Sequence, residues 1–208
     1  MQTSAKEKNV NMRILFVSLF IVLLDQITKL LVRGFEIPFL GIKVEGMRLG
    51  ESKQVIGDFI RITYTENPGI AFGINFGNKL YLTLLTIVAV GIVFIYLYKV
   101  RNGHFLTRLS LEMIFGGAIG NLIDRVFHSV IFNYGKIFHD RVIDFIDIDF
   151  FNFTLFGYHI DRWPIFNIAD ASVTIGVLLL FFAHREKPAS EPVEEINPLM
   201  LDDASNEK

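Results

Sequence analysis

The stretch LYLTLLTIVAVGIVFIYLY (residues 80–98) contains no charged side chain. A helix that crosses a bilayer needs about 20 mostly apolar residues, and this stretch has that length and composition. The rest of the chain is also apolar, because 51% of its 208 residues are hydrophobic and 21 residues are phenylalanine. Such a composition is too apolar for an ordinary soluble domain, so it indicates the membrane class.

Three further stretches resemble this one in length and apolar content. We therefore predict four transmembrane helices, at about residues 12–32, 80–98, 105–126 and 166–183. The third is the least uniform, because polar residues interrupt it: Arg108, Glu112, Asn121 and Asp124. The first is too long for a cleaved signal peptide, and no A-x-A site follows it, so we interpret it as a retained helix.

Basic residues near the ends of the predicted helices indicate the orientation of the chain. They gather before the first helix, between the second and third, and after the fourth, which places both termini in the cytoplasm. We predict one membrane domain over residues 1–183, with outer segments at about 34–79 and 127–163. Residues 184–208 are acidic and lack an apolar period, so we predict a disordered cytoplasmic tail there.

Each outer segment contains a strand pattern. In VIGDFIRITYTENPGIAFG (residues 55–73) the side chains alternate from Phe59 to Thr65, and an Asn-Pro-Gly turn sequence follows. In RVIDFIDIDFFNF (residues 141–153) acids alternate with large apolar residues. The predicted fold class is therefore a membrane protein that is mainly α, with four transmembrane helices and a small extracytoplasmic β-element lying on the membrane.

Several kinds of chemistry have no residues to support them. The chain has no cysteine, which excludes disulfides, thiolate catalysis, cysteine-based zinc sites and lipidation of the protein itself. Its net charge of -2 and the absence of a basic stripe argue against a nucleic-acid partner. The five histidines are scattered without ligand spacing, and neither H-E-x-x-H nor G-x-S-x-G occurs. We therefore predict no metal site and no cofactor.

Polar residues gather in GGAIGNLIDRV (residues 116–126). Gly116 and Gly120 form a G-x-x-x-G pattern, which is typical of close helix contacts in lipid. Gly117, Asn121 and Asp124 share one helical face, and Arg125 lies one turn after Asn121. We favour a role in or beside a functional site, and the alternative is an Asp–Arg pair that anchors the helix end at the headgroups.

Asp25 and Lys29 lie four residues apart on the outer half of the first predicted helix. An ion pair inside a membrane usually faces the interior of the bundle. We favour a structural role for Lys29, whereas Asp25 is open to bonding the outer loops or a substrate.

The remaining acids lie near the predicted outer surface, and most of them are expected to be solvated loop charges: Asp140, Asp144, Asp147, Asp149, Asp161 and Asp170. Asp144 differs because apolar residues surround it, which predicts burial. In FNIADASVTIGVLLLFF (residues 166–182) Asp170 stands at the head of an apolar helix, where Asn167 and Asp170 are also suited to capping. If that helix brings Asp170 beside Asp144, the two carboxyl groups share one proton and can activate water for peptide hydrolysis.

Five motifs together resemble one known family. DQITK (25–29), ENPGIAFG (66–73), GGAIGNLIDRV (116–126), VIDF (142–145) and FNIADAS (166–172) are similar, in this order, to lipoprotein signal peptidase, the bacterial type II signal peptidase. The resemblance spans about residues 14–183. It implies an intramembrane aspartyl endopeptidase that cleaves prolipoproteins just before a cysteine carrying diacylglycerol. It also implies a multi-pass protein of the bacterial cytoplasmic (inner) membrane with its site near the outer face.

The resemblance also assigns residues. It implies that Asp144 and Asp170 are the catalytic pair, and that Asp124 belongs to the third-helix motif without being catalytic. The other family positions, implied to bind substrate or support the site, are Asp25, Lys29, Asn67, Gly117, Asn121, Arg125 and Asn167. The implied partners are lipidated prolipoprotein signal peptides and membrane lipid, and we predict a monomer.

Three departures from the family pattern and two alternative functions accompany this interpretation. The stretches between Arg125 and Asp144 and between Asp144 and Asp170 look longer than in many members, and Ala171 stands where serine is frequent. A small transporter would need acids near the bilayer midplane and a polar path to both faces. A non-catalytic scaffold would tolerate replacement of Asp144 and Asp170 by asparagine.

Overall fold

The structure is a computed structural model, and it describes residues 15–71, 74–75, 79–131, 141–149, 153–155, 158–160 and 162–183. The predicted tail at 184–208, and Asp140 and Asp161, lie outside the described residues. The elements are, in order, α1 (Phe16–Arg33), β1 (Gly34–Ile37), the short 3-10 helix η2 (Pro38–Leu40), β2 (Ile42–Glu45), β3 (Ser52–Ile56), β4 (Ile60–Asn67), β5 (Ile70–Ala71), β6 (Ile74–Asn75), α2 (Lys79–Lys99), α3 (Phe105–Ile131), β7 (Val142–Ile148), β8 (Phe153–Leu155), β9 (Tyr158–Ile160) and α4 (Ile168–Ala183).

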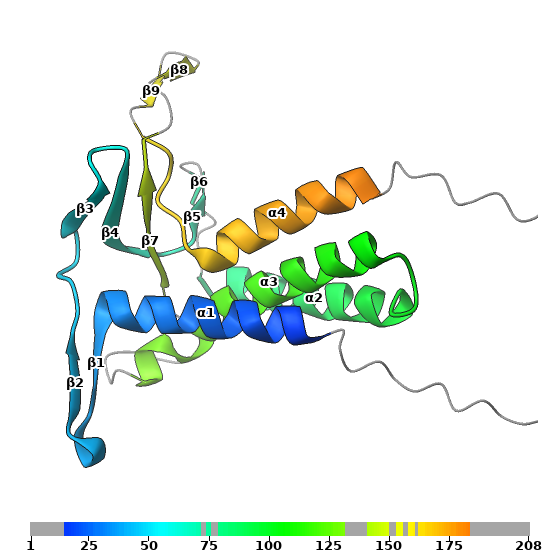
Figure 1. The fold of residues 1–208 in the computed structure, drawn as a ribbon, viewed down its shortest axis with the longest axis horizontal. Coiled ribbons are helices and arrows are strands. Elements are labelled where there is room, and N and C mark those ends of the chain that lie inside the picture. Colours follow the sequence, from blue (N-terminus) through cyan, green and yellow to red (C-terminus); the bar gives the residue numbers. More distant parts are fainter. Residues whose placement is uncertain are drawn as a thin grey trace, which may run out of the picture.

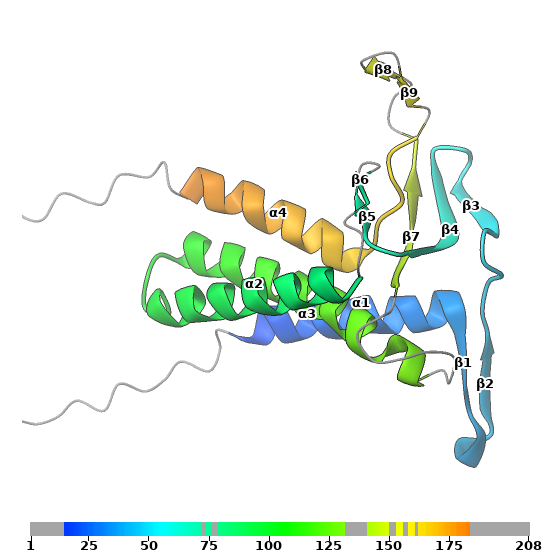
Figure 2. The same ribbon diagram turned by 180° about the vertical axis from the view of Figure 1, so that it is seen from behind.

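The helices form a bundle with α3 in contact with each of the other three (Figure 1). The start of α1, the link between α2 and α3, and the end of α4 lie at one end of this bundle, and the strands lie at the other (Figures 1 and 2). Gly116 allows the close approach that its G-x-x-x-G pattern predicts, because a Cβ there would lie 2.8 Å from the Ser18 carbonyl oxygen in α1.

One helix boundary differs from the prediction. We predicted that the third helix ends at residue 126 and that an outer segment begins at 127, but α3 continues to Ile131. Its extension has a local reason, because no proline or glycine follows Arg125 until residue 135. The outer segment is therefore shorter than predicted.

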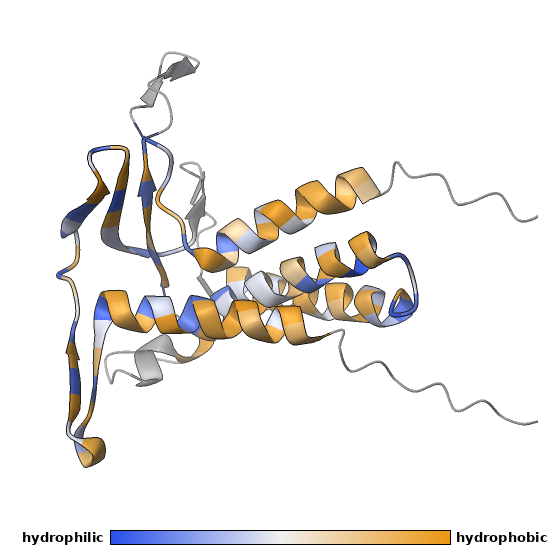
Figure 3. Ribbon diagram, in the orientation of Figure 1, coloured by the Kyte–Doolittle hydropathy of each residue, from blue (hydrophilic) through white to orange (hydrophobic). Residues whose placement is uncertain are grey.

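The bundle buries polar residues and exposes apolar ones. Its buried polar residues include Ser18, Asp25, Lys29, Thr83, Ser110, Glu112, Asp124, Asn167 and Ser172. Large apolar side chains such as Phe20, Leu85 and Phe181 are exposed, so hydrophobic colour covers the helices in Figure 3. Apolar faces of this extent on a soluble protein would mark an interaction surface.

The prediction of four membrane-spanning helices is only partly supported by length and composition. Among the described helices, α2 alone is long and apolar enough to span a bilayer, over Leu80–Lys99. α1 contains three ionisable residues, α3 is interrupted by polar residues, and α4 has only 16 residues.

Strands β3, β4 and β7 form an antiparallel sheet in that spatial order. β4 ends at Asn67, and Gly69 follows with a φ of 98°, so the predicted strand and turn are both confirmed. The register places Thr65 of β4 opposite Asp144 of β7. One apolar cluster packs the sheet against the end of α1, and it comprises Val32, Tyr64, Ile143 and Phe145.

Asp147 of β7 departs from the expectation that most outer acids are solvated. Asp147 is only 5% exposed, and its carboxylate accepts hydrogen bonds from Arg162 Nε at 2.6 Å and Thr63 Oγ1 at 2.7 Å. A buried carboxylate of this kind is stabilised by such charge-assisted bonds. The residue thus holds the sheet to the segment that leads into α4.

Candidate active site

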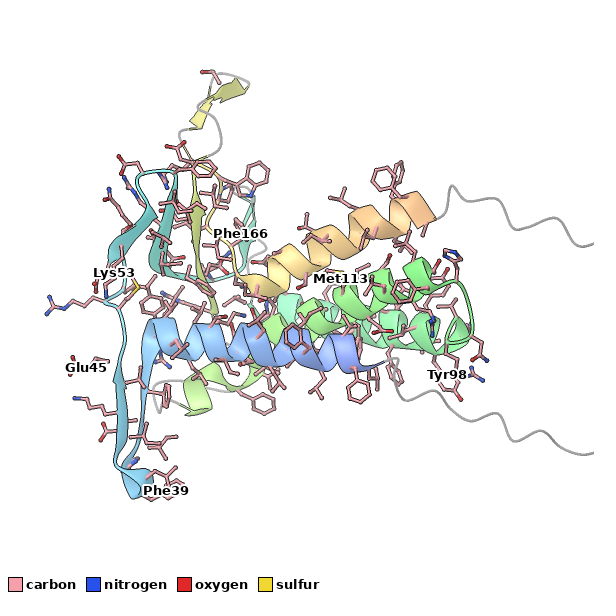
Figure 4. The ribbon with its side chains drawn as sticks, in the orientation of Figure 1. Phe39, Glu45, Lys53, Tyr98, Met113 and Phe166 are labelled. Carbon is pink, nitrogen blue, oxygen red and sulfur yellow. The ribbon has the colours of Figure 1, made fainter. Side chains whose placement is uncertain are left out.

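A backbone connection brings the start of α4 to β7. Phe166, which precedes α4 (Figure 4), forms a bridge with Ile146, and the two residues exchange hydrogen bonds of 2.7 and 3.1 Å. Phe145 N also donates to the Phe166 carbonyl oxygen at 3.1 Å. Asp144 lies two residues before Ile146, so this pairing places Asp144 next to the first turn of α4.

Asn167 and Asp170 cap the N-terminus of α4 reciprocally. Asn167 Oδ1 accepts a hydrogen bond from the Asp170 amide at 2.8 Å, and Asp170 Oδ2 accepts one from the Asn167 amide at 3.2 Å. This is the arrangement of a capping box. The capping interpretation of the motif is therefore correct, and it leaves Asp170 Oδ1 directed to another partner.

The Asn167 side chain joins the two predicted catalytic acids. Its Nδ2 donates to Asp144 Oδ1 at 2.7 Å, while its backbone and Oδ1 bind Asp170. Asn167 is completely buried. One asparagine therefore holds both carboxyl groups at the junction of β7 and α4.

Asp144 is only 3% exposed, and its surroundings favour the protonated form. Burial and the neighbouring Asp170 charge raise the pKa of Asp144 from 3.8 to about 7. Hydrogen bonds from the side chains of Asn67 and Asn167 act in the opposite direction but are weaker. Asp144 therefore holds its proton at a pH where an ordinary aspartate is ionised.

Asn121 of α3 connects Asp170 to the interior of the bundle. Its Nδ2 donates to Asp170 Oδ1 at 2.8 Å. Its Oδ1 accepts from Asn167 Nδ2 and from Lys29 Nζ, both at 3.1 Å. These bonds define the orientation of the Asn121 amide.

Lys29 lies between two buried carboxylates beneath this junction. Its Nζ is 2.7 Å from Asp25 Oδ2 and 2.8 Å from Asp124 Oδ2, and all three side chains are almost inaccessible. Buried charges are stable only when they are paired and hydrogen-bonded. This arrangement agrees with the structural role predicted for Lys29.

The two acids that bind Lys29 also hold the two segments that carry Asp144 and Asp170. Asp25 Oδ1 accepts a hydrogen bond from the Ala169 amide at 3.0 Å, one residue before Asp170. Asp124 Oδ2 accepts one from the Ile143 amide at 3.2 Å, one residue before Asp144. We call Lys29, Asp25 and Asp124 the lysine clamp.

The other predicted site residues line the same region. A Cβ at Gly117 would overlap the Ala169 carbonyl oxygen, so glycine lets the first turn of α4 lie directly on α3. Arg125 is within electrostatic range of Asp170 and Asp144, and its Nε and Nη1 are buried without a hydrogen-bond partner among the described residues. In the described part of the chain no group of three or more His, Cys, Asp or Glu side chains is arranged to hold a metal ion.

Sequence reasoning missed Gln26. Its Nε2 donates to Asp124 Oδ1 and to the Gly120 carbonyl oxygen, both at 3.0 Å, and to Asp25 Oδ2 at 3.2 Å. A glutamine within an apolar helix next to an aspartate is a pattern that could have indicated this role.

A family model described as "Signal peptidase (SPase) II" matches residues 17–185. The chain belongs to the signal peptidase II family. A Pelodictyon phaeoclathratiforme protein named lipoprotein signal peptidase is 39% identical over 176 residues, which cover 84% of this chain and 91% of that protein. A Staphylococcus carnosus protein of the same name is 34% identical over 169 residues, covering 81% and 87% respectively.

Solved structures agree with this family membership. A structure described as a bacterial membrane enzyme has a TM-score of 0.59 and 30% identity, and the match covers 94% of this chain and 92% of that one. A second, also described as a bacterial membrane enzyme, has a TM-score of 0.60 at 30% identity. The signal peptidase II fold of this chain, helices with a small sheet, is thus similar to that of solved membrane enzymes.

Proposed function

We propose that this chain is an intramembrane aspartyl endopeptidase that removes signal peptides from diacylglyceryl-modified prolipoproteins, with Asp144 and Asp170 as its catalytic acids. The observation that carries the proposal is the hydrogen bonding of both carboxyl groups to Asn167. The names of the relatives support the substrate class.

The burial pattern supports a multi-pass position in the membrane. In lipid, polar side chains are expected to face the interior of a helix bundle and apolar side chains to face outward, as they do in this bundle. The basic residues of the α2–α3 link favour a cytoplasmic position for that end in a bacterial cell. The acids at the strand end then lie near the outer face of the cytoplasmic (inner) membrane.

The surroundings of the two acids suit them to different roles in the reaction. Asp144, with its pKa of about 7, is the protonated member. Asp170 accepts hydrogen bonds from Asn121 and Asn167 in the first turn of α4, where the helix dipole favours a negative charge. Asp170 is therefore suited to act as the general base.

The reaction needs neither a metal nor a covalent intermediate. Asp170 takes a proton from a water molecule, and the water oxygen bonds to the carbonyl carbon of the scissile peptide while Asp144 protonates the carbonyl oxygen. The C–N bond then breaks as Asp170 protonates the nitrogen and a hydroxyl of the intermediate returns a proton to Asp144. Both acids regain their resting states.

The remaining site residues position or bind. Asn67, Asn121 and Asn167 orient the two carboxyl groups, and Asp25 and Lys29 hold the backbone that carries them. Gly117 permits the contact between α3 and α4. The Arg125 donors that have no partner among the described residues are suited to a carbonyl or ester oxygen of the substrate. All these groups come from one chain, so the site is complete in a monomer.

The protonation state of Asp144 predicts the pH dependence. Because burial raises its pKa to about 7, the protonated form of Asp144, which acts as the acid, is lost as the pH rises through that value. We expect kcat/KM to fall about tenfold per pH unit on the alkaline side. Initial rates measured from about pH 6 to about pH 9 in one detergent test this, and a flat or rising profile would contradict the assignment of Asp144 as the acid.

The substrate class is tested with a matched pair of prolipoprotein peptides that differ only in diacylglyceryl modification of the cysteine. The purified protein in lipid vesicles is expected to cleave the modified peptide immediately before the cysteine. The unmodified peptide is expected to be cleaved at least about 100-fold more slowly, because the energy of binding the diacylglyceryl group, remote from the reacting bond, helps to accelerate the reaction there. Mass spectrometry locates the cut. Equal cleavage of both peptides, or cleavage elsewhere, would overturn the proposed substrate.

A further inference from the structure

The β1–β2 hairpin has one apolar face and one polar face. Its strands pair with Phe35 opposite Val44 and Ile37 opposite Ile42, so these four side chains share a face. Glu36 lies opposite Lys43 on the other face, which also carries the exposed Glu45. The hairpin is thus amphipathic along its whole length.

The tip of the hairpin is apolar and exposed. Phe39 is 85% exposed and Leu40 is 57% exposed. The strands pair only with each other among the described strands, and their main contacts outside the hairpin are with α1. A two-stranded hairpin of this kind is marginally stable in water unless its apolar face is covered.

The hairpin continues directly from the strand-side end of α1 and runs across the direction of that helix (Figure 1). Glu45 points away from the helices, whereas Phe39 lies at the tip on the side of the helices (Figure 4). The apolar side chains therefore face the side on which the helices lie, at the end of α1 where this helix would emerge from the lipid.

The base of the hairpin is held tightly. A Cβ added to Gly46 would overlap the backbone of Arg33, and a Cβ on Gly34 would overlap the backbone of Gly46. Met47 N donates to the Val32 carbonyl oxygen at 2.7 Å, and Met47 packs on the cluster that joins the sheet to α1. The direction of the hairpin is thus coupled to the position of the β3–β4–β7 sheet.

We propose that the β1–β2 hairpin lies flat on the outer leaflet, with its apolar face and tip inserted among the lipids as an interfacial anchor. Apolar side chains of α1, such as Ile27 and Leu31, are exposed as well, and in this placement the charged face of the hairpin, with Lys43 and Glu45, is turned to water. Amphipathic helices bind membrane interfaces in the same way, with the apolar face in the lipid and the polar face in water. The inference rests on the membrane orientation in the proposed function. It adds a lipid contact that sets the distance between the membrane and the sheet carrying Asp144.

The absence of cysteine allows a direct test by single-site labelling. An environment-sensitive fluorophore is attached to Phe39→Cys or Leu40→Cys, and to Glu36→Cys or Lys43→Cys as matched controls on the polar face. Each protein is reconstituted in vesicles of phosphatidylglycerol and phosphatidylethanolamine, with or without a quencher on the acyl chain. We expect emission at shorter wavelength and several-fold stronger quenching at the two tip positions than at the two polar-face positions. Cleavage of the modified peptide confirms that each labelled protein is folded.

Ile27→Cys, on the exposed face of α1, separates this inference from the proposed membrane position, because Ile27 is 53% exposed. Quenching at Ile27→Cys with no quenching at either tip position would overturn the anchor and leave the membrane position intact. Absence of quenching at all positions would overturn both. A wavelength shift at the tip that disappears when the protein is diluted with excess lipid would assign the face to a second copy of the chain, and would also overturn the anchor.

Discussion

Replacing Asp144 or Asp170 by asparagine is expected to reduce cleavage of the modified prolipoprotein by at least about 10³-fold, because each change removes one partner of a general acid–base pair. Asparagine keeps an oxygen and the size of the side chain. In Asp170→Asn this oxygen can still accept the Asn167 amide hydrogen that closes the capping box. The loss is therefore expected in kcat while the protein remains folded.

The stability of Asp144→Asn provides a second measurement. The folded-state pKa of Asp144 is raised from 3.8 to about 7, so this group lowers the stability of the fold as the pH rises from 3.8 to about 7, and the loss persists above that pH. At about pH 8 the neutral amide is expected to give a melting temperature at least as high as that of the parent protein. A large fall in melting temperature together with lost cleavage would assign Asp144 to folding rather than to catalysis.

Asp149→Asn is the matched control, because Asp149 follows β7 directly and its side chain is partly exposed beside Arg162 at 3.3 Å. This variant is expected to cleave at nearly the parent rate. Cleavage is followed by gel mobility at matched protein levels. Retention of activity in either Asp144→Asn or Asp170→Asn would exclude the proposed pair.

Replacing Lys29 by methionine is expected to produce the largest loss of stability. The change leaves Asp25 and Asp124 buried without their cation, and removing one partner of a buried ion pair costs about 3–5 kcal/mol. Since these acids hold the Ala169 and Ile143 amides, the two segments that carry Asp144 and Asp170 are expected to separate. Denaturant unfolding in detergent and cleavage of the modified peptide measure the two effects.

A compensated variant distinguishes charge from shape in the lysine clamp. Lys29→Met combined with Asp25→Asn and Asp124→Asn removes all three charges and keeps both side-chain oxygens that accept the backbone amides. It is expected to recover much of the stability lost in Lys29→Met. Lys43→Met, which removes a lysine from an exposed pair, is expected to be neutral. Parent-like stability and cleavage in Lys29→Met would show that the clamp is unnecessary.

The two candidate catalytic acids, Asp144 and Asp170, were predicted from the sequence, but the residues that hold them in place were not all predicted. The apolar residues around Asp144 correctly predicted its burial. The sequence suits Asp170 both to capping and to chemistry, and in the structure its carboxylate closes the capping box and also accepts a hydrogen bond from Asn121. The sequence pattern could indicate a polar role for Gln26 and Asp124, but their partners could not be predicted, because each contact joins elements far apart in sequence.

The sequence by itself determined the membrane class, the approximate helices, the strand that ends at Asn67 and the family motifs. These features depend on composition, on periodicity along one segment and on short runs of residues, which act locally. Only the tertiary structure decided which groups meet. The bridge between Phe166 and Ile146 brings Asp144 to Asn167, and the lysine clamp holds the segments that carry both acids. Contacts between residues distant in the chain depend on how packed elements align, and no local pattern specifies that alignment.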